Sequence, residues 1–326
     1  MATNTTSLDF LLNSISSQLN RYFSIFIFIF GVIGNILNCI VLSQRPHRTN
    51  PCSFYFLISS MASLTSIVSG LTTRMLAGYA VDLTNTIDWL CKFRIYVLMV
   101  SRTIALWLIA LASIDRWLLS SANQQYRKMS SLKNAYSSML IVIIFSMMLY
   151  AQLIYCYQAN LTQTPLKCYG KTEICRMTTD FSYAVITVVI PIIVMIIFGL
   201  LTISNVKNSR RRIFTKTVTQ IFTNGHNQLQ RWRKTDYYLL LMLLVQIVLY
   251  CSFTLPQAVQ KIYSTMTERH IKSSLQNAIE NLAFNILLLL TYLSSGIPFY
   301  IYTLCGGKIF RQTLIDVFKR ISQRRT

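Results

Sequence analysis

Negative charge is scarce in this sequence, which has 10 Asp and Glu residues against 31 Lys and Arg residues among 326. Only 13% of the residues are charged and 53% are hydrophobic, and the content of 10 Gly and 6 Pro excludes a collagen-like or disordered chain. Histidine is rare too, and His47, His226 and His270 lie far apart in expected loops. No HExxH, GxSxG or glycine-rich phosphate-loop motif is present. We therefore expect no enzyme, no metal site and no cofactor.

Long stretches of the chain contain no charged residue. These stretches are 22–44, 49–73, 134–166, 181–206, 237–260 and 281–307, and a seventh, 95–114, is interrupted only by Arg102. Each reaches the roughly 20 residues that a helix needs to cross a bilayer. The sequence therefore predicts an all-α membrane protein with seven spanning helices. Their expected bounds are 22–43, 53–77, 89–121, 135–157, 180–206, 235–262 and 279–304.

The basic residues indicate how these spans are oriented. If the N-terminus lies outside, most Lys and Arg residues fall in the inner connections, as is usual for cytoplasmic loops. The glycosylation acceptor sequences at Asn4 and Asn160 then both lie outside. We expect an extracellular segment 1–21 without a cleavable signal, a plasma-membrane domain 22–304 and a cytoplasmic tail 305–326. Nucleic-acid binding is disfavoured, because the basic residues alternate with the spans.

Eight cysteines are distributed over both sides of this arrangement. Those at positions 39, 52, 251 and 305 lie in spans or near the reducing side. Those on or near the oxidising outer side are Cys91, Cys156, Cys168 and Cys175, which allow three full pairings. Cys156 lies near the end of the fourth span, where we expect a buried free thiol.

Several landmarks follow one another along the spans. The first span carries "GNILN" with Asn35, and the third begins at Cys91 and reaches "DRW", with Arg116 standing 25 residues after Cys91. The fifth and sixth spans contain Pro191 and Pro256, and a proline inside a helix bends its axis. In this joint pattern, residues 20–322 resemble the rhodopsin-like (class A) family of G-protein-coupled receptors.

The resemblance implies a receptor that binds an extracellular ligand and activates a heterotrimeric G protein. The inner switch would consist of Asp115, Arg116, Trp117, Asp236 and Tyr302. At rest Arg116 would pair with Asp236 on the sixth span, and movement of that span would release it. A simpler alternative is that Asp115 and Arg116 only anchor a helix end at the membrane surface.

The resemblance also implies a disulfide bond from Cys91 to the following outer loop. Cys168 is the expected partner, because the alternative, Cys175, lies only 16 residues before Pro191 and leaves little loop to reach back over the third span. The family has a further helix after the seventh span. Here the apolar residues Phe310, Leu314, Val317, Phe318 and Ile321 recur at helical spacing, which predicts an amphipathic helix at 307–321 on the membrane surface.

Some positions depart from the family pattern. Ser63 replaces the usual Asp of the second span, and too few oxygen ligands remain for a sodium ion, so we expect no sodium site. The seventh span reads "GIPFYIYTL" instead of Asn-Pro-x-x-Tyr, with Pro298 or Phe299 in the proline position and Tyr302 as the counterpart of the Tyr. These changes suggest a divergent branch, similar to invertebrate peptide receptors.

Arg102 lies within the third span, on the same face as Arg116 and about 16 Å below Cys91. A charge at that depth costs at least ~2.5 kcal/mol on insertion scales and usually marks a functional residue. Either Arg102 binds an anionic group of the ligand, or polar neighbours such as Ser295 and water satisfy it. The expected ligand pocket consists of Leu98, Arg102, Thr254, Gln257 and Thr291.

The sequence disfavours a biogenic amine as the ligand and excludes a retinal Schiff base. Leu98 stands where amine receptors share an Asp, and the seventh span has no Lys that could form a retinal Schiff base. A peptide and a small acidic molecule remain as ligands. A transporter or channel remains as the alternative function, although it would usually show several intramembrane charges or internal repeats.

Overall fold

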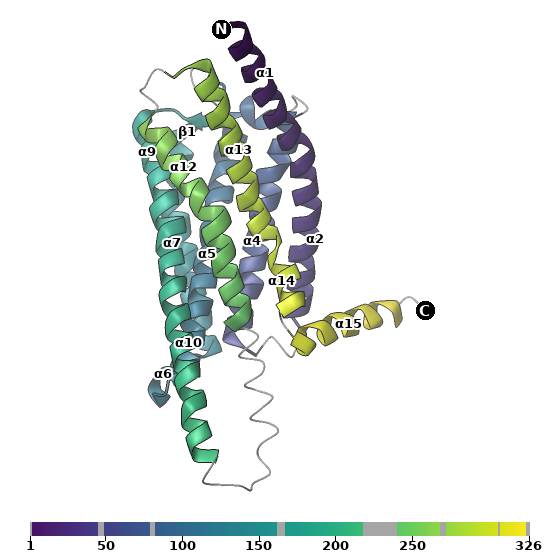
Figure 1. The fold of residues 1–326 in the computed structure, drawn as a ribbon, viewed down its shortest axis with the longest axis vertical. Helices are drawn as coiled ribbons and strands as arrows, with labels where there is room; N and C mark the ends of the chain where they lie inside the picture. Colours follow the sequence, from purple (N-terminus) through teal and green to yellow (C-terminus); the bar gives the residue numbers. More distant parts are fainter. Residues whose placement is uncertain are drawn as a thin grey trace.

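The structure, a computed structural model, describes residues 2–44, 49–78, 82–161, 167–217, 240–267, 272–305 and 307–323. Within these ranges nearly all residues are helical, and the long helices run side by side as a bundle (Figure 1). We refer to the end of the bundle that carries the N-terminus as the upper end. The lower end is the one that carries α15 (Gly307–Gln323).

Seven helices of the described residues are long and apolar enough to cross a membrane. They are Leu8–Leu42, Pro51–Leu76, Asp88–Ser120, Leu132–Cys156, Glu173–Asn208, Leu240–Met266 and Ser274–Gly296. Each overlaps one of the seven stretches that lack charged residues or are interrupted only by Arg102, so the predicted seven-helix fold is confirmed. The chain is a multi-pass membrane protein.

The first span is longer than predicted. α1 (Ala2–Gln18), the π-helical turn η1 (Leu19–Phe23) and α2 (Ser24–Leu42) form one continuous helix. No Gly or Pro interrupts residues 2–23, so no residue there opposes helix formation strongly. α1 also packs against α13 (Ser274–Gly296), where Asn285 Nδ2 donates a hydrogen bond of 2.7 Å to Ser16 Oγ.

Helix irregularities occur beside the prolines. The π-helical segment η3 (Ser182–Val189) leads into α10 (Ile190–Thr217), which contains Pro191. A helix at 240–249 leads through η4 (Tyr250–Thr254) into α12 (Leu255–Met266), which contains Pro256. Because proline lacks an N–H and its ring displaces the preceding carbonyl, the regular hydrogen-bond ladder cannot pass it unchanged. α13 ends at Gly296, and α14 (Pro298–Cys305) begins at Pro298, a favoured first helical residue.

α5 (Asp88–Ser120) occupies the centre of the bundle. It packs against α4 (Pro51–Gly78), α7 (Leu132–Tyr150) and α10. Two short elements lie in the connections on either side of it, η2 (Leu83–Asn85) and α6 (Gln124–Met129).

The "GNILN" segment of α2 lies against α13. A Cβ atom added to Gly296 would lie 2.9 Å from the Gly31 Cα atom, so this close approach of the two backbones requires glycine. Asn35 uses the approach, because its Nδ2 donates to Gly31 O (2.8 Å) and across to Ser295 O (3.1 Å). The signature Asn of the first span therefore ties the first and last spans together.

A short hairpin closes the upper end. Its strands β1 (Tyr157–Gln158) and β2 (Tyr169–Gly170) pair in antiparallel register. A disulfide bond joins Cys91 of α5 to Cys168, just before β2, with the two Cα atoms 5.8 Å apart. This is the pairing expected from the resemblance.

A second disulfide bond joins Cys156 to Cys175. The expectation that Cys156 is a free thiol is therefore wrong. Cys156 ends α8 (Leu153–Cys156), and Cys175 lies in the first turn of α9 (Glu173–Phe181). Thr172 caps this helix by accepting a hydrogen bond from Cys175 N, so the helix begins well before the predicted start near 180 and brings the two cysteines within reach.

α15 leaves the lower end at a steep angle to the bundle (Figure 1). Phe310 packs against Phe299 and Tyr302, with ring centroids 6.2 Å apart in each pair. Arg311 Nε donates to Thr303 O (3.0 Å), which satisfies a carbonyl near the end of α14. Three further apolar positions predicted for this helix, Val317, Phe318 and Ile321, have side chains outside the described part of the structure.

Candidate functional site

A buried ion pair lies at the lower end of α5. Arg116 Nη2 is 2.8 Å from Asp115 Oδ2, and both side chains are almost fully buried. Arg116 Nη2 also donates to Asn50 Oδ1 (3.1 Å), and Ser130 Oγ donates to Asp115 Oδ1 (2.6 Å). Such additional hydrogen bonds are needed to offset the desolvation of a buried pair. The pair is thus held by residues from two other parts of the chain.

Other residues of the predicted switch lie around this pair or beyond the described ranges. Trp117 packs against Tyr126 of α6 and Phe198 of α10, with ring centroids 5.5 Å and 5.2 Å away. Asp236 lies outside the described residues, so its pairing with Arg116 stays a prediction. Sequence patterns point neither to Asn50 nor to Ser130 as partners of the pair, although Asn before Pro51 is a typical helix start.

A buried hydrogen bond in the lower half joins the last two spans. The Tyr302 hydroxyl group donates to Gln246 Oε1 (3.1 Å), and both side chains are 1% exposed. The Tyr302 ring also packs against Phe56 of α4, with centroids 5.0 Å apart. Gln246 was not among the predicted site residues. The sequence does show Gln246 as a polar side chain inside the charge-free stretch 237–260. A buried amide group needs a hydrogen-bond partner, so this position could have been recognised as part of a buried polar contact.

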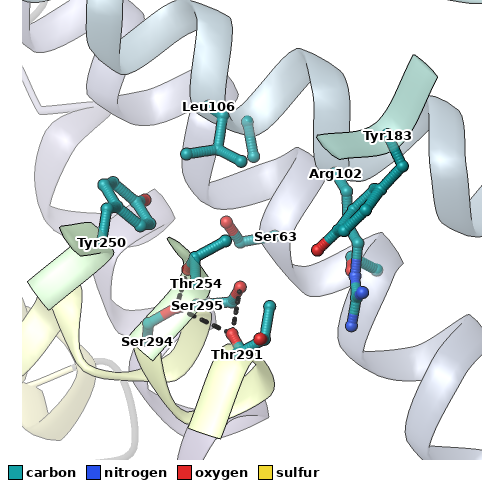
Figure 2. A pocket seen from close by; sticks show the side chains of 11 residues that line it. Ser63, Arg102, Leu106, Tyr183, Tyr250, Thr254, Thr291, Ser294 and Ser295 are labelled. Carbon is teal, nitrogen blue, oxygen red and sulfur yellow. Dashed lines mark hydrogen bonds between the residues drawn. The ribbon is translucent and has the colours of Figure 1, made fainter. Parts of the chain in front are cut away.

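A small polar cavity lies inside the bundle (Figure 2). Its volume is about 10 Å³, which is room for about one water molecule. Its wall includes the hydroxyl-bearing residues Ser63, Ser66, Tyr183, Tyr250, Thr254, Thr291, Ser294 and Ser295. Among the described residues that line the cavity, Arg102 alone carries a charge.

Several of these hydroxyl groups are already hydrogen-bonded. Thr254 Oγ1 and Ser294 Oγ lie 3.3 Å apart, and Ser294 and Ser295 both donate to Thr291 O, at 2.8 Å and 3.2 Å. Ser66 Oγ differs, because it is buried and has no hydrogen-bond partner within the described ranges. The cavity wall therefore combines satisfied hydroxyl groups with a free one.

Arg102 is 5% exposed. It lies next to Tyr183, on the side of the cavity away from Thr254 and Ser294 (Figure 2). Its guanidinium carbon is 4.3 Å from the centroid of the Tyr292 ring, a cation–π contact. Arg102 Nε and Nη2 have no hydrogen-bond partner among the described residues. The Tyr183 hydroxyl group, close to this guanidinium, donates to Gln257 Oε1 (2.7 Å).

The residues of the predicted ligand pocket lie in adjoining positions. Arg102, Thr254 and Thr291 line the same cavity, and Gln257 is linked to Arg102 through Tyr183. Leu98 lies in an apolar cluster with Tyr292, one helical turn from Arg102 towards the upper end. Tyr183 and Tyr292, the two rings against Arg102, were not predicted, because no motif marks them.

Two further arginines lie towards the upper end. Arg74 Nη1 donates to Asn285 Oδ1 (2.7 Å), and Arg94 Nε donates to Ser69 O (3.2 Å). Both are close enough to Arg102 for electrostatic repulsion. Asp82 lies close enough to Arg74 and Arg94 to offset part of this charge, but the three arginines outnumber it. This part of the bundle therefore keeps an excess of positive charge, which favours anions.

An ion pair connects the upper parts of the fifth and sixth spans. Lys261 Nζ of α12 lies 2.6 Å from Asp180 Oδ1 of α9, and Thr265 Oγ1 donates to Asp180 Oδ2 (2.8 Å). Lys261 Nζ also lies 5.3 Å from the centroid of the Tyr183 ring. No sequence pattern pairs Asp180 with Lys261, since the two belong to different spans.

One of the two predicted glycosylation acceptors has a described side chain. Asn160 follows β1 at the upper end and has a positive φ of 59°, a conformation that Asn tolerates better than most residues. Its Nδ2 donates to Thr86 O (3.0 Å). Asn4 lies in α1, and its side chain is outside the described part of the structure.

Comparison with known proteins places this arrangement in a family. Residues 34–302 match the family described as 7 transmembrane receptor (rhodopsin family). No individual curated protein matches the chain. The matched region contains Asn35, the Cys91–Cys168 disulfide bond, the Asp115–Arg116 pair and the proline-containing helices, and it covers most of the 326 residues. The chain therefore belongs to the rhodopsin family of seven-transmembrane receptors, whose members are generally not enzymes.

Proposed function

We propose that this protein is a G-protein-coupled receptor of the plasma membrane, which binds an extracellular ligand in its upper half and activates a heterotrimeric G protein through its lower face. The observation that carries the proposal is the buried Asp115–Arg116 pair with its partners Asn50 and Ser130. Because these partners come from separate parts of the chain, relative movement of the helices changes the surroundings of Arg116. A ligand that favours one arrangement can thereby control access of a G protein to it.

In this proposal the upper end faces the outside. Both disulfide bonds lie there, and disulfide bonds form and persist in oxidising surroundings. The lower end carries basic residues, including Arg127 and Lys128 in the last turn of α6, which agrees with the usual enrichment of cytoplasmic loops.

The ligand in this proposal is a peptide or a small acidic molecule with an anionic group that reaches Arg102. The electropositive surroundings formed by Arg74, Arg94 and Arg102 support this choice. The cavity beside Arg102 has a volume of only about 10 Å³, so the helices must separate before an acidic group can enter. Ligand entry is therefore coupled to helix movement, as signalling requires.

Nucleotide exchange tests the proposal. The full chain in lipid nanodiscs is mixed with purified heterotrimeric G proteins and screened with peptides and small carboxylic and phosphate compounds. We expect at least one compound to accelerate exchange with the unaltered protein and not with Arg116→Ala. Arg127→Ala, which removes an exposed arginine of α6 at the same end, is the matched control and should respond normally. Compound-driven tracer flux without exchange would instead support the alternative, a transporter or channel.

A further inference from the structure

The unpartnered polar atoms around Arg102 are mainly hydrogen-bond donors. Arg102 Nε and Nη2 and Gln257 Nε2 are buried without a partner among the described residues, and all three are N–H groups that cannot accept a hydrogen bond. The Ser66 hydroxyl group, which can donate, is unpartnered as well. Tyr183 lies between Arg102 and Gln257. The Tyr183 hydroxyl group accepts a hydrogen bond from Arg102, but Arg102 Nε and Nη2 are left without an acceptor among the described residues.

No carboxylate of the described residues forms an ion pair with Arg102 either. The guanidinium group of arginine stays protonated in proteins. In the recorded ion pairs, other cations hold the carboxylates Asp88, Asp115, Asp180 and Glu280. The Tyr292 ring compensates only one face of the guanidinium. A buried charge needs a fuller counter-charge, because its removal from water is costly.

The cavity limits the size of the group that can supply this charge. Its volume of about 10 Å³ admits a single particle about as large as a water molecule. A carboxylate or phosphate group has several heavy atoms and is too large for this space. Water fits but leaves the arginine charge unbalanced, and a sodium ion would be repelled by it. A monatomic anion is the smallest species that supplies the missing negative charge.

We infer that the cavity binds a chloride ion, held by the Arg102 guanidinium group and by hydroxyl groups of the wall such as that of Ser66. Chloride is the abundant monatomic anion of biological fluids, and it accepts hydrogen bonds from N–H and O–H groups without donating any. The ion lies between α4, α5, η4 and α13, and it neutralises Arg102 in the closed bundle. This inference does not rest on the proposed function, because a halide can bind whether or not the chain couples to a G protein.

Thermal unfolding of the purified full chain in detergent micelles tests the inference. Chloride replaces gluconate in steps from about 1 mM to about 200 mM at constant ionic strength, so that a ligand-linked rise in Tm is separated from general screening. We expect Tm to rise with chloride along a saturable curve, and bromide to act in the same way. Gluconate and sulfate, which are too large, should have no effect. Equal Tm values in chloride and gluconate, or equal stabilisation by sulfate, would overturn the inference.

Variants locate the ion. Arg102→Gln should abolish the halide dependence. Arg94→Gln is the matched control, because Arg94 lies two turns away on the same helix and donates to Ser69 O, and its halide dependence should be retained. The opposite result for these two variants would contradict the assignment.

A milder variant covers the case in which Arg102→Gln does not fold. Ser66→Ala removes one hydroxyl group from the cavity wall and keeps the arginine. It should weaken the apparent chloride affinity about tenfold, the loss expected for one hydrogen bond to a charged group. If Ser66→Ala leaves the chloride affinity unchanged and no other variant changes this affinity, the ion lies elsewhere and the proposed site is refuted.

Discussion

Ser130 donates a hydrogen bond of 2.6 Å to Asp115 Oδ1, while the other oxygen of the same carboxylate binds Arg116. The connection between α6 and α7 is thereby tied to the lower end of α5. The orientation of the Asp115 carboxylate, and with it the position of Arg116, depends on a loop residue.

Ser130→Ala removes this tie. We expect ligand-independent nucleotide exchange to rise, by up to about tenfold, because the variant loses a charged hydrogen bond of the arrangement described here, which we assign to the resting state. Exchange is measured at equal amounts of receptor. Ser131→Ala is the control, since Ser131 caps α7 through Asn134 N and does not contact Asp115. An equal rise in both variants would show that loop stability, and not the Asp115 contact, is responsible.

Asp236→Ala should also raise ligand-independent signalling, because it removes the proposed resting partner of Arg116. The measurement is the second-messenger level without ligand at equal surface expression. Asp316→Ala removes an acid from an exposed position of α15 and should leave this level unchanged. The proposed pairing is wrong if Asp236→Ala leaves the basal level unchanged too.

Arg102→Ala should weaken agonist potency by more than ~1.5 kcal/mol, the lower range for a charged hydrogen bond. Arg102→Lys should lose potency as well, because an ammonium group cannot reproduce a bidentate guanidinium contact. Dose–response curves normalised to surface receptor provide the measurement. A purely structural role predicts reduced surface expression with preserved potency, and that outcome would exclude Arg102 as the ligand anchor.

Tyr302→Phe should lower the free energy of unfolding by about 1–3 kcal/mol, because Gln246 Oε1 is left buried without its donor. Gln246→Leu combined with Tyr302→Phe should destabilise less than the sum of the two single changes, since both polar partners are then absent. Denaturation in detergent measures all four proteins of this cycle. Strict additivity would mean that the hydrogen bond contributes no stability.

Replacement of Cys156 and Cys175 by Ala should destabilise the protein by about 3 kcal/mol, the loop-closure value for a sequence separation of this size. Cys251→Ala, which removes a free thiol, is the control. Mass spectrometry of non-reduced peptides should find Cys156 linked to Cys175 and Cys91 linked to Cys168. A peptide that links Cys91 to Cys175 would contradict the structure.

The spans could be predicted from the sequence because lipid excludes charge, so that a stretch such as 95–114 identifies its helix without knowledge of its neighbours. The hydrogen-bond partners of Asp115 and Tyr302 could not be predicted in this way. Ser130 and Gln246 become neighbours of these residues only through the path of a loop and the rotation of a helix about its axis. Cys156 was misassigned for a local reason, since the Thr172 cap sets the start of α9 and thereby the position of Cys175.

The ties at the upper end have a mechanical consequence for the sixth span. Both disulfide bonds and the Asp180–Lys261 ion pair lie there, and the ion pair holds α12 to α9 near one end of the helix Leu240–Met266. A helix of 27 residues is about 40 Å long at a rise of ~1.5 Å per residue. A tilt of about 10° around the tied end displaces the free end by roughly 7 Å. The sixth span therefore pivots near Lys261. A small rotation of this helix beside Arg102 becomes a large displacement of its lower end.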